Sequence, residues 1–327
     1  MIEAAQGSKG PRSVAEVLAA LDGGDPGPVP SGFEPLDTAL EGGFRTRELV
    51  IVGGPPGIGK TSVALQWARH AAAAGRAVVY ACYEHDEATL LGRLLAQEVG
   101  ELGIGDAPAS QQTMSTVRAV TRGETLLEEA LSNDTLLRSA YGRLDAYAHR
   151  LWLVRASGVD TGLTELRAMA EDFGKGAVLF VDYLQKIPSD VDTVTEGERV
   201  AHLVEGLKEL ALDRDIAVIA VVVGDDSALS ARRLRLQHLR GAAALAYEAD
   251  IVLMLNEKAL AVSKSHSAFD SVRAQEFNSQ VVLSIDKNRG GPAPIDMEFT
   301  KDLAHFRLEP QGAIVEDRLI DNLLYPE

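Results

Sequence analysis

Residues 48–62 of the chain read Glu-Leu-Val-Ile-Val-Gly-Gly-Pro-Pro-Gly-Ile-Gly-Lys-Thr-Ser. An apolar run leads into the pattern GxxxxGK[ST], and a helical pattern follows it. The glycines let successive backbone N–H groups surround a phosphate, and the N-terminus of the next helix attracts the same anion. We predict that Lys60 reaches the β- and γ-phosphate oxygens and that the Thr61 hydroxyl binds Mg²⁺. The predicted nucleotide-binding residues are Gly54, Pro55, Pro56, Gly57, Ile58, Gly59, Lys60, Thr61 and Ser62.

Short apolar segments alternate with longer amphipathic segments on both sides of this loop. We expect strands at residues 49–52, 77–81, 150–154, 177–181, 217–223, 251–255 and 281–287. We expect helices at residues 61–74, 87–98, 162–173 and 200–213. Strands that are apolar throughout and separated by helices are typical of a largely parallel sheet covered on both faces. The sequence therefore predicts one large α/β domain over residues 31–312, with a helical insertion near residues 101–149.

The two ends of the chain differ from this alternating region. Residues 1–12 are small and polar, and we expect them to be disordered. At residues 13–22, apolar side chains follow Ser13 with helical spacing, which predicts a capped helix with one apolar stripe. A stiff Pro/Gly linker is expected to follow, up to residue 30. The acidic and apolar tail, residues 313–327, is either a docking segment or a packed C-terminus.

The composition argues against several classes of protein. Asp and Glu number 48 against 32 Lys and Arg, so the formal charge is −16, which argues against a protein coated in nucleic acid but permits a short basic loop. No apolar run approaches the roughly 18 residues of a membrane helix, and the N-terminus lacks the pattern of a signal peptide. We therefore expect a cytoplasmic protein with no membrane partner. The single cysteine, Cys82, permits neither an internal disulfide nor a cysteine metal cluster.

Two of the predicted strands end at a carboxylate. Asp182 follows the apolar residues 177–181, where a carboxylate at the edge of a sheet would associate with Mg²⁺. The alternative is a turn or helix-capping Asp. Glu84 ends the strand near residues 77–83 and could orient or deprotonate the water that attacks the γ-phosphate. By spacing alone it could equally be an acidic residue in the first turn of a helix.

Further segments carry a pattern beyond the phosphate loop. They are residues 31–37 with Gly42-Gly43, Tyr83-Glu84 with Leu90, Leu91 and residues 93–95, Asp182-Tyr183-Leu184-Gln185, Leu239-Arg240-Gly241 before residues 248–252, and residues 287–290. Read together, these segments resemble the C-terminal ATPase domain of DnaB-type replicative helicases, within the RecA/KaiC-like group. The resemblance covers about residues 30–310.

The resemblance implies a RecA-like P-loop fold with ATP and Mg²⁺ as cofactors. It implies that Glu84 is the catalytic carboxylate and that Asp182 joins Thr61 at the metal. Arg289, with Lys287 beside it, would reach the γ-phosphate bound by a neighbouring subunit. A homo-oligomeric ring, a hexamer in this family, is therefore implied. The helix at residues 13–22 resembles the linker helix that hooks onto an adjacent subunit; the alternative is a helix that docks on its own chain.

The chain also departs from the family pattern. Gly224-Asp225-Asp226 stands where the family has a Ser-Gln pair, so Gln185 and Asp225 are the candidates for coupling to the γ-phosphate. The loop at residues 188–196 is acidic or neutral, which is hostile to a phosphate backbone. Arg232, Arg233 and Arg235 occupy the place of a DNA loop and are the candidate nucleic-acid contacts, although a solvated loop or a partner-docking surface fits equally. About 30 residues precede the ATPase region, so we expect no primase coupling.

Two functions from different classes remain. The first is a DnaB-like ring ATPase that acts as a DNA-dependent single-strand translocase or helicase. The second is a KaiC-like regulatory or assembly ATPase that acts on a protein partner and does not move on DNA. A passive nucleotide-binding scaffold is a third, weaker interpretation.

Overall fold

The computed structural model describes residue 11 and residues 13–21, 26–103, 107–191, 195–229, 231–262 and 271–321. The expected disorder of residues 1–12 concerns a segment that lies outside these ranges, apart from residue 11. Parts of the expected linker, of the loop at residues 188–196 and of the tail also lie outside them.

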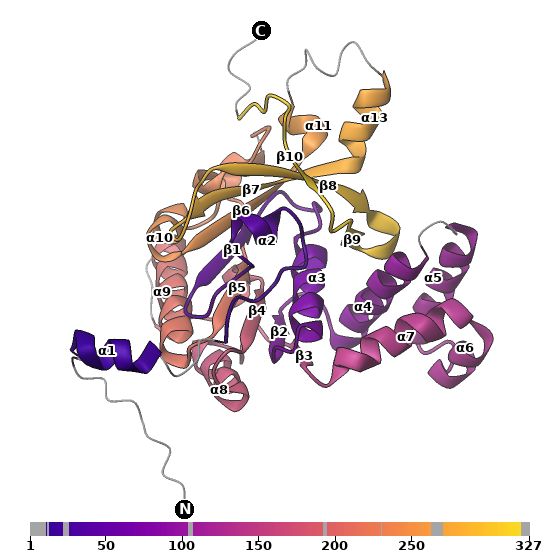
Figure 1. The fold of residues 1–327 in the computed structure, drawn as a ribbon, viewed down its shortest axis with the longest axis horizontal. Helices are drawn as coiled ribbons and strands as arrows, with labels where there is room; N and C mark the ends of the chain where they lie inside the picture. Colours follow the sequence, from indigo (N-terminus) through magenta and orange to yellow (C-terminus); the bar gives the residue numbers. More distant parts are fainter. Residues whose placement is uncertain are drawn as a thin grey trace, which may run out of the picture.

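A twisted central sheet forms the middle layer of the fold (Figure 1). Its strands are, in chain order, β1 (Leu49–Gly53), β2 (Val78–Cys82), β3 (Leu151–Arg155), β4 (Val178–Asp182), β5 (Ala217–Val221), β6 (Ile251–Glu257), β7 (Gln280–Asn288), β8 (Ile295–Asp302), β9 (Arg307–Leu308) and β10 (Ala313–Ile314). The order across the sheet is β10-β8-β7-β6-β1-β5-β4-β2-β3, and β9 pairs with β8. The strands from β6 to β3 run parallel, whereas β7, β8 and β10 add an antiparallel edge.

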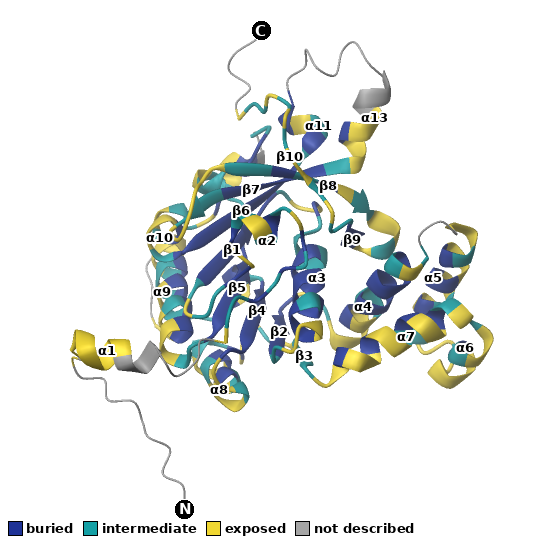
Figure 2. Ribbon diagram, viewed as in Figure 1, coloured by how far each residue is buried: buried dark blue, intermediate teal, exposed yellow. Residues whose placement is uncertain are grey.

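Helices cover both faces of the parallel strands because alternate residues of each strand are buried on opposite sides. Val50 and Val52 of β1 pack toward α3 (Lys60–Ala73) and α4 (Glu87–Leu102). Leu49 and Ile51 pack on the other face. The helices of that second layer are α8 (Leu163–Phe173), α9 (Glu196–Arg214) and α10 (Ala242–Glu248). Figure 2 shows the strands buried between the two layers.

The remaining helices lie outside these layers. They are α1 (Val14–Leu21), α2 (Leu36–Ala39), α5 (Ala107–Thr121), α6 (Leu127–Asn133), α7 (Thr135–Ala148), α11 (Lys258–Ala261) and α13 (Ser271–Ser279), with 3₁₀ turns at Leu184–Lys186, Asp226–Leu229, Leu236–His238 and Leu303–His305. Helices α5–α7 follow α4 in the chain and gather beside it at one side of the molecule (Figure 1). None of the helices in the described part of the chain has the length and hydrophobicity needed to span a bilayer.

The predicted α/β fold with a mostly parallel sheet is confirmed, but the sheet is larger than predicted. The expected strand at residues 281–287 is present as β7, and it runs antiparallel to β6. Strand β8 was not predicted because its sequence, Ile-Asp-Met-Glu-Phe-Thr-Lys-Asp, alternates apolar and polar residues instead of being apolar throughout. Such alternation is typical of an antiparallel strand with one face in the core. β10 of the tail pairs with β8, and further along the tail Leu319 forms a bridge with Val262.

Helix α1 forms as its sequence predicts, and its side chains from Val14 to Leu18 lie in solvent. The Ser13 hydroxyl accepts a hydrogen bond from the Glu16 backbone N–H at 3.2 Å, and the Glu16 carboxylate accepts one from the Ser13 N–H at 2.6 Å. This reciprocal pair is a capping box. Val14 is 76% exposed and Leu18 is 60% exposed. α1 lies beside the body of the molecule rather than on it (Figure 1).

Candidate nucleotide-binding site

The loop between β1 and α3 has the backbone that its glycines allow. Gly54 adopts a φ of +152°, and a Cβ there would lie 2.6 Å from the Leu255 carbonyl oxygen. Gly59 has a φ of +98° and precedes α3, with open space where a side chain would stand. A larger residue would therefore collide with β6 at the first position and strain the backbone at both.

The first turn of α3 has unpaired N–H groups at the loop. No side chain caps this end of the helix, so its N–H groups and the positive end of its dipole remain available to an anion. The Lys60 ammonium donates hydrogen bonds to the carbonyl oxygens of Gly54 at 2.8 Å and Pro55 at 2.9 Å. Burial lowers the pKa of Lys60, although the nearby carboxylates of Asp182 and Glu84 act in the opposite direction. A phosphate bound at this site would place a negative charge beside the partly desolvated ammonium and so stabilise its charged form.

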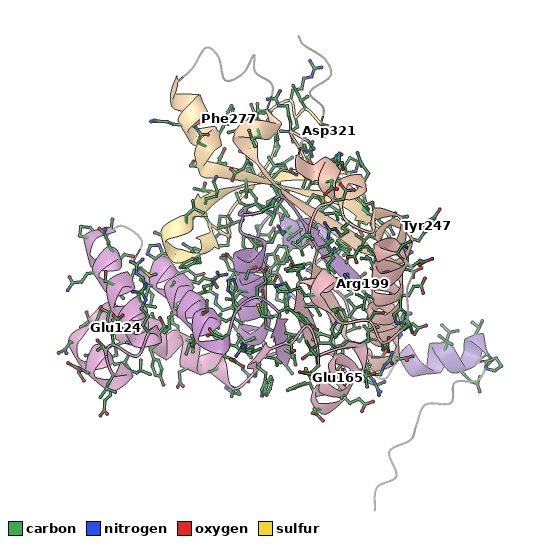
Figure 3. All side chains as sticks on the ribbon, turned by 180° about the vertical axis from the view of Figure 1, so that it is seen from behind. Glu124, Glu165, Arg199, Tyr247, Phe277 and Asp321 are labelled. Carbon is green, nitrogen blue, oxygen red and sulfur yellow. The ribbon has the colours of Figure 1, made fainter. Side chains whose placement is uncertain are left out.

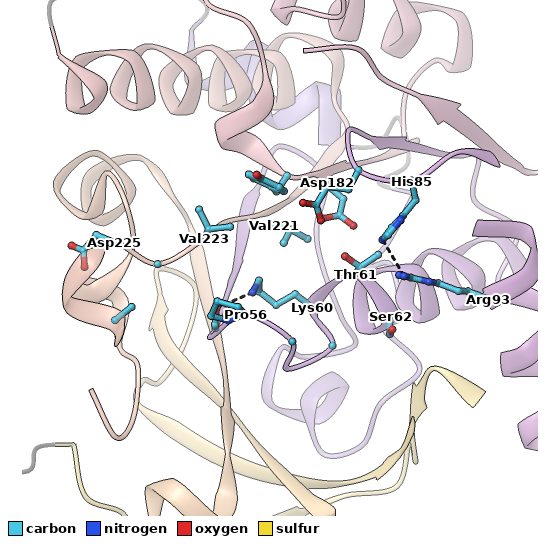
Figure 4. Close-up of a pocket in the computed structure, with 17 residues that line it drawn as sticks. Pro56, Lys60, Thr61, Ser62, His85, Arg93, Asp182, Val221, Val223 and Asp225 are labelled. Atoms are coloured by element: carbon cyan, nitrogen blue, oxygen red, sulfur yellow. Dashed lines mark hydrogen bonds between the residues drawn. The ribbon is translucent and has the colours of Figure 1, made fainter. Parts of the chain in front are cut away.

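A cavity of about 410 Å³ joins the loop to the predicted carboxylates. Its lining includes Glu84 together with Lys60, Thr61, Asp182 and Asp225, the four of these that Figure 4 labels. The strand order explains why Glu84 and Asp182 line the same cavity. β2 and β4 are parallel neighbours, and Cys82 lies opposite Asp182. The carboxyl ends of parallel strands lie at one edge of a sheet, so the residues that follow β2 and end β4 face the same cavity.

Asp182 is held by donors although it is only 1% exposed. The Tyr80 hydroxyl donates to its carboxylate at 2.9 Å, and the Thr61 hydroxyl is a second hydrogen-bond partner. Burial raises the pKa of Asp182, and the hydrogen bonds from Thr61 and Tyr80 work against that rise. A carboxylate and a threonine hydroxyl are hard oxygen ligands of the kind that Mg²⁺ prefers.

These residues fit a metal that arrives with the nucleotide. Within the described ranges, no group of three or more His, Cys, Asp or Glu side chains could hold a metal ion. Mg²⁺ is commonly held by one or two protein oxygens together with substrate phosphates and water. Asp182 and Thr61 supply the protein oxygens, and the open cavity leaves room for the phosphates.

A histidine and an arginine also face the cavity beside Glu84. Arg93 of α4 contacts the His85 Nε2 atom at 3.0 Å, as the dashed line in Figure 4 shows. The Arg93 guanidinium lies 5.3 Å from the centre of the Phe306 ring, which supports it from the other side. Burial, then the Arg93 charge, lowers the pKa of His85. The predicted site did not include this pair, although Arg93 stood in one of the segments that carry the resemblance.

Gln185 links the two loops that lie beyond β4 and β5. Its side chain is buried, and its amide oxygen accepts from the Val223 N–H at 3.3 Å. Its amide nitrogen donates to the Arg240 carbonyl at 3.4 Å. Asp225 lines the cavity, and hydrogen bonds from Ser227 lower its pKa. A shift of either loop would therefore change the hydrogen bonds of Gln185.

The phosphate loop follows the end of β1, whereas Lys287 and Arg289 lie at the other end of the parallel strands, near the starts of β1 and β6. Because β7 is antiparallel to β6, Asn288 pairs with Ile251 at the start of β6. The Lys287 ammonium donates to the Ala246 carbonyl at 2.6 Å, and Arg289 contacts Asp250 at 3.3 Å. Arg289 also donates to the Tyr247 carbonyl at the end of α10. These residues are not brought together with the cavity of their own chain.

The candidate nucleic-acid arginines are largely engaged within the chain. Arg233 is 3% exposed and pairs with Asp296 and the Ser284 hydroxyl. Arg235 pairs with Asp286 at 2.9 Å. Arg232 donates to the carbonyls of residues 260 and 262, with no carboxylate partner among the described ion pairs.

The tail adds a further acid to this cluster. Asp321 lies 3.5 Å from Arg233 and 3.7 Å from Arg235. Figure 3 shows Asp321 at the same end of the molecule as Phe277 of α13. In this conformation, Arg233 and Arg235 hold β7, β8 and the tail together instead of facing a nucleic acid.

Comparison with known proteins matches most of this chain to a family of helicase domains. Residues 28–308 match the model of the DnaB-like helicase C-terminal domain. The replicative DNA helicase DnaB of Treponema pallidum is 28% identical over 284 residues, which is 85% of this chain and 55% of the helicase. The replicative DNA helicase DnaB of Rickettsia bellii is 26% identical over 289 residues, covering 81% of this chain and 54% of the helicase.

Solved structures show the same fold at lower identity. One of them, an ATPase domain, superposes with a TM-score of 0.70 at 19% identity, over 91% of this chain and 99% of that domain. A DnaB-like replicative helicase, solved in work on its interactions with primase, superposes with a TM-score of 0.66 at 19% identity, over 91% of this chain and 67% of that one. This chain spans about half the length of the DnaB proteins that it matches.

Proposed function

The chain belongs to the family of DnaB-like helicase C-terminal domains, and from this premise we propose that it hydrolyses Mg·ATP at the loop of residues 54–62. The observation that carries the proposal is the single cavity that joins Lys60, Thr61, Glu84 and Asp182. Each of these side chains has a distinct task in hydrolysis.

The binding residues act on the phosphates. Lys60 and the N–H groups of the α3 N-terminus bind the β- and γ-phosphate oxygens. Thr61 and Asp182 hold the Mg²⁺ that arrives with ATP. When bound, the metal ion neutralises charge on the phosphate oxygens.

Glu84 completes the reaction within the subunit. Its carboxylate is exposed to the cavity, so it is free to orient a water molecule and to accept a proton from it. In contrast, Asp182 is buried and held by Tyr80 and Thr61, which suits a fixed ligand better than a mobile base.

Arg289 acts on the cavity of a neighbouring subunit. It stands beyond the far end of β1, a strand of five residues that spans roughly 15 Å. Its side chain is 46% exposed, so it is available at the surface. An arginine that serves another copy of the chain requires head-to-tail contacts, which form a closed ring when the rotation between successive subunits closes on itself. We assign the protein to such a homo-oligomeric ring, with six subunits as in the helicases of this family.

The substrate of the motor is single-stranded DNA. The named relatives are replicative DNA helicases, and Gln185 connects the cavity side of the sheet to the loop that carries Arg232 and Arg240. Arg240 is exposed and Arg232 has no carboxylate partner among the described ion pairs. These arginines are the proposed contacts with the phosphate backbone, and Arg233 and Arg235 support the loop from beneath.

A second function is favoured by the same ion pairs. Asp286, Asp296 and Asp321 neutralise Arg233 and Arg235, which leaves little positive charge for a nucleic acid. A KaiC-like regulatory or assembly ATPase that acts on a protein partner would need no such charge.

ATP hydrolysis with and without a long single-stranded DNA separates the two functions. The full chain is assayed at low salt, with K60A as the blank. A severalfold stimulation by DNA that declines with added salt supports the translocase, because phosphate contacts release counterions. Basal hydrolysis without stimulation supports the regulatory ATPase. Equal rates for the wild type and K60A would contradict both.

A further inference from the structure

A buried tyrosine lies directly behind the metal-binding residues of the proposed site. Tyr80 stands in the middle of β2, fully buried, and stacks on Phe180 of β4 with ring centroids 5.6 Å apart. Tyr80 and Phe180 are opposite each other in the sheet, as are Cys82 and Asp182. Because side chains alternate along a strand, Tyr80, Phe180 and Asp182 all face the α3 side of the sheet.

The Tyr80 hydroxyl lies between Asp182 at the end of β4 and Thr61 at the start of α3. It is 2.9 Å from the Asp182 carboxylate and 3.3 Å from the Thr61 backbone oxygen. A phenol has one hydrogen to donate, and the shorter contact with a charged acceptor takes it.

The Tyr80 hydroxyl is a polar group inside an otherwise apolar strand. The neighbours of Tyr80 in β2 are Val79 and Ala81, and the whole strand is buried. Burying a hydroxyl costs desolvation free energy, which an apolar side chain at this position would not incur. Only the hydrogen-bond acceptors that the Tyr80 hydroxyl contacts offset this cost. Removing its oxygen would leave the Asp182 carboxylate, 1% exposed, with one donor fewer.

We propose that Tyr80 is a positioning residue for the Mg²⁺ of the bound nucleotide: its hydroxyl fixes the orientation of the Asp182 carboxylate against Thr61. The inference rests on the proposed Mg·ATP site and adds to it a residue that lies outside the phosphate-loop motif and the other segments with family resemblance. The hydroxyl acts through Asp182 and does not touch the nucleotide.

The chain contains a matched control for this hydroxyl. Tyr147 of α7 is 5% exposed and donates to the Glu98 carboxylate at 2.9 Å, the same distance as in the Tyr80 pair. Tyr147 does not line the nucleotide cavity. Y147F therefore removes the same atom from the same kind of hydrogen bond, away from the site.

The experiment measures metal-dependent nucleotide binding by the full chain. The fluorescence of bound mant-ADP is followed first in EDTA and then during a Mg²⁺ titration. For Y80F we expect the half-saturating Mg²⁺ concentration to rise about tenfold, the ratio that corresponds to about 1.4 kcal/mol. The mant-ADP affinity in EDTA should change less than twofold. Y147F should match the wild type in both measurements.

Two further variants keep the test decisive. Y80M lacks the hydroxyl and gives a second measurement if circular dichroism shows that Y80F has not folded. In a D182N background the charged acceptor is gone, so adding Y80F should shift the Mg²⁺ midpoint less than twofold.

The possible outcomes separate the two proposals. An unchanged midpoint in folded Y80F and Y80M, or an equal shift with and without D182N, would overturn the role of Tyr80. A wild-type chain that binds no mant-ADP would instead overturn the proposed nucleotide site.

Discussion

Replacing Arg289 with Ala should abolish hydrolysis without disturbing the cavity of the same subunit. The arginine stands beside Asp250, at the opposite end of the sheet from Gly54, so it cannot contact a phosphate bound by its own chain. It is 46% exposed, and its loss should cost less than about 1 kcal/mol of folding free energy. An arginine supplied to a transferring phosphoryl group contributes about 10³–10⁵-fold in rate. We therefore expect R289A to lose at least about 10³-fold in ATP turnover while binding mant-ATP normally.

Mixing two inactive variants tests whether the arginine acts between subunits. K60A lacks a working cavity but keeps Arg289, whereas R289A has the opposite defect. In rings assembled at random from equal amounts of both, a working interface needs an R289A cavity next to a K60A arginine. That combination has a probability of about ½ × ½, so the mixture should recover about a quarter of wild-type turnover.

The mixture gives a clear refutation. If Arg289 acted within its own chain, every subunit of the mixed ring would be defective and turnover would stay at the level of the single variants. Size-exclusion chromatography with light scattering must show that the two variants assemble together. If the variants assemble together and ATP turnover does not recover, Arg289 does not act on the cavity of a neighbouring subunit.

Three further predictions concern Glu84 at the cavity and the ion pairs that Glu98 and Glu101 make with Arg69. E84Q should lower ATP turnover about 10²–10⁴-fold, measured by phosphate release, and keep mant-ATP affinity within about threefold, because an amide cannot accept the proton. E98Q should lower the free energy of unfolding in urea by about 3 kcal/mol, since Glu98 is 1% exposed and contacts Arg69, which is 2% exposed, at 2.9 Å. Burial alone would raise the pKa of Glu101, but a hydrogen bond from His70 and the charge and hydrogen bond of Arg69 hold it well below its ordinary 4.5. The difference in free energy of unfolding between the wild type and E101Q should therefore be largest above about pH 5, and it should shrink as the pH falls further.

Each of these predictions has an outcome that contradicts it. Turnover by E84Q close to that of the wild type would remove Glu84 from catalysis. Y147F is the mild control for E98Q, because it removes one hydrogen bond to Glu98 and no charge. Equal losses for the two variants would mean that the charge of Glu98 contributes little. A stability difference between wild type and E101Q that grows as the pH falls would have the wrong sign for a depressed pKa.

Elements specified by neighbouring residues were predictable from the sequence. The loop of residues 54–61 is set by its own glycines, and the strands that end near Glu84 and Asp182 are apolar throughout. The parallel order of β2 and β4 then brings the two carboxylates to one edge. Ser13 and Glu16 likewise cap α1 within one turn.

Features that depend on distant residues were not predictable. The arginines near residue 233 resemble a DNA loop in the sequence, but their acidic partners are Asp286, Asp296 and Asp321, far along the chain. The phenol of Tyr80 similarly meets Asp182 only because β2 lies beside β4. Strand β8 alternates polar and apolar residues, so its place depended on the hairpin with β7.

The identities and spacing of neighbouring residues specify the backbone of the glycine-rich loop, the alternation of strands and helices, and the residue types that line the cavity. Strand pairing and long-range packing set which charges are neutralised, which end of the sheet carries Arg289, and which hydroxyl contacts Asp182. The physical reason is that backbone geometry and apolar periodicity are local properties, whereas a hydrogen bond or an ion pair between distant residues exists only after the strands have paired.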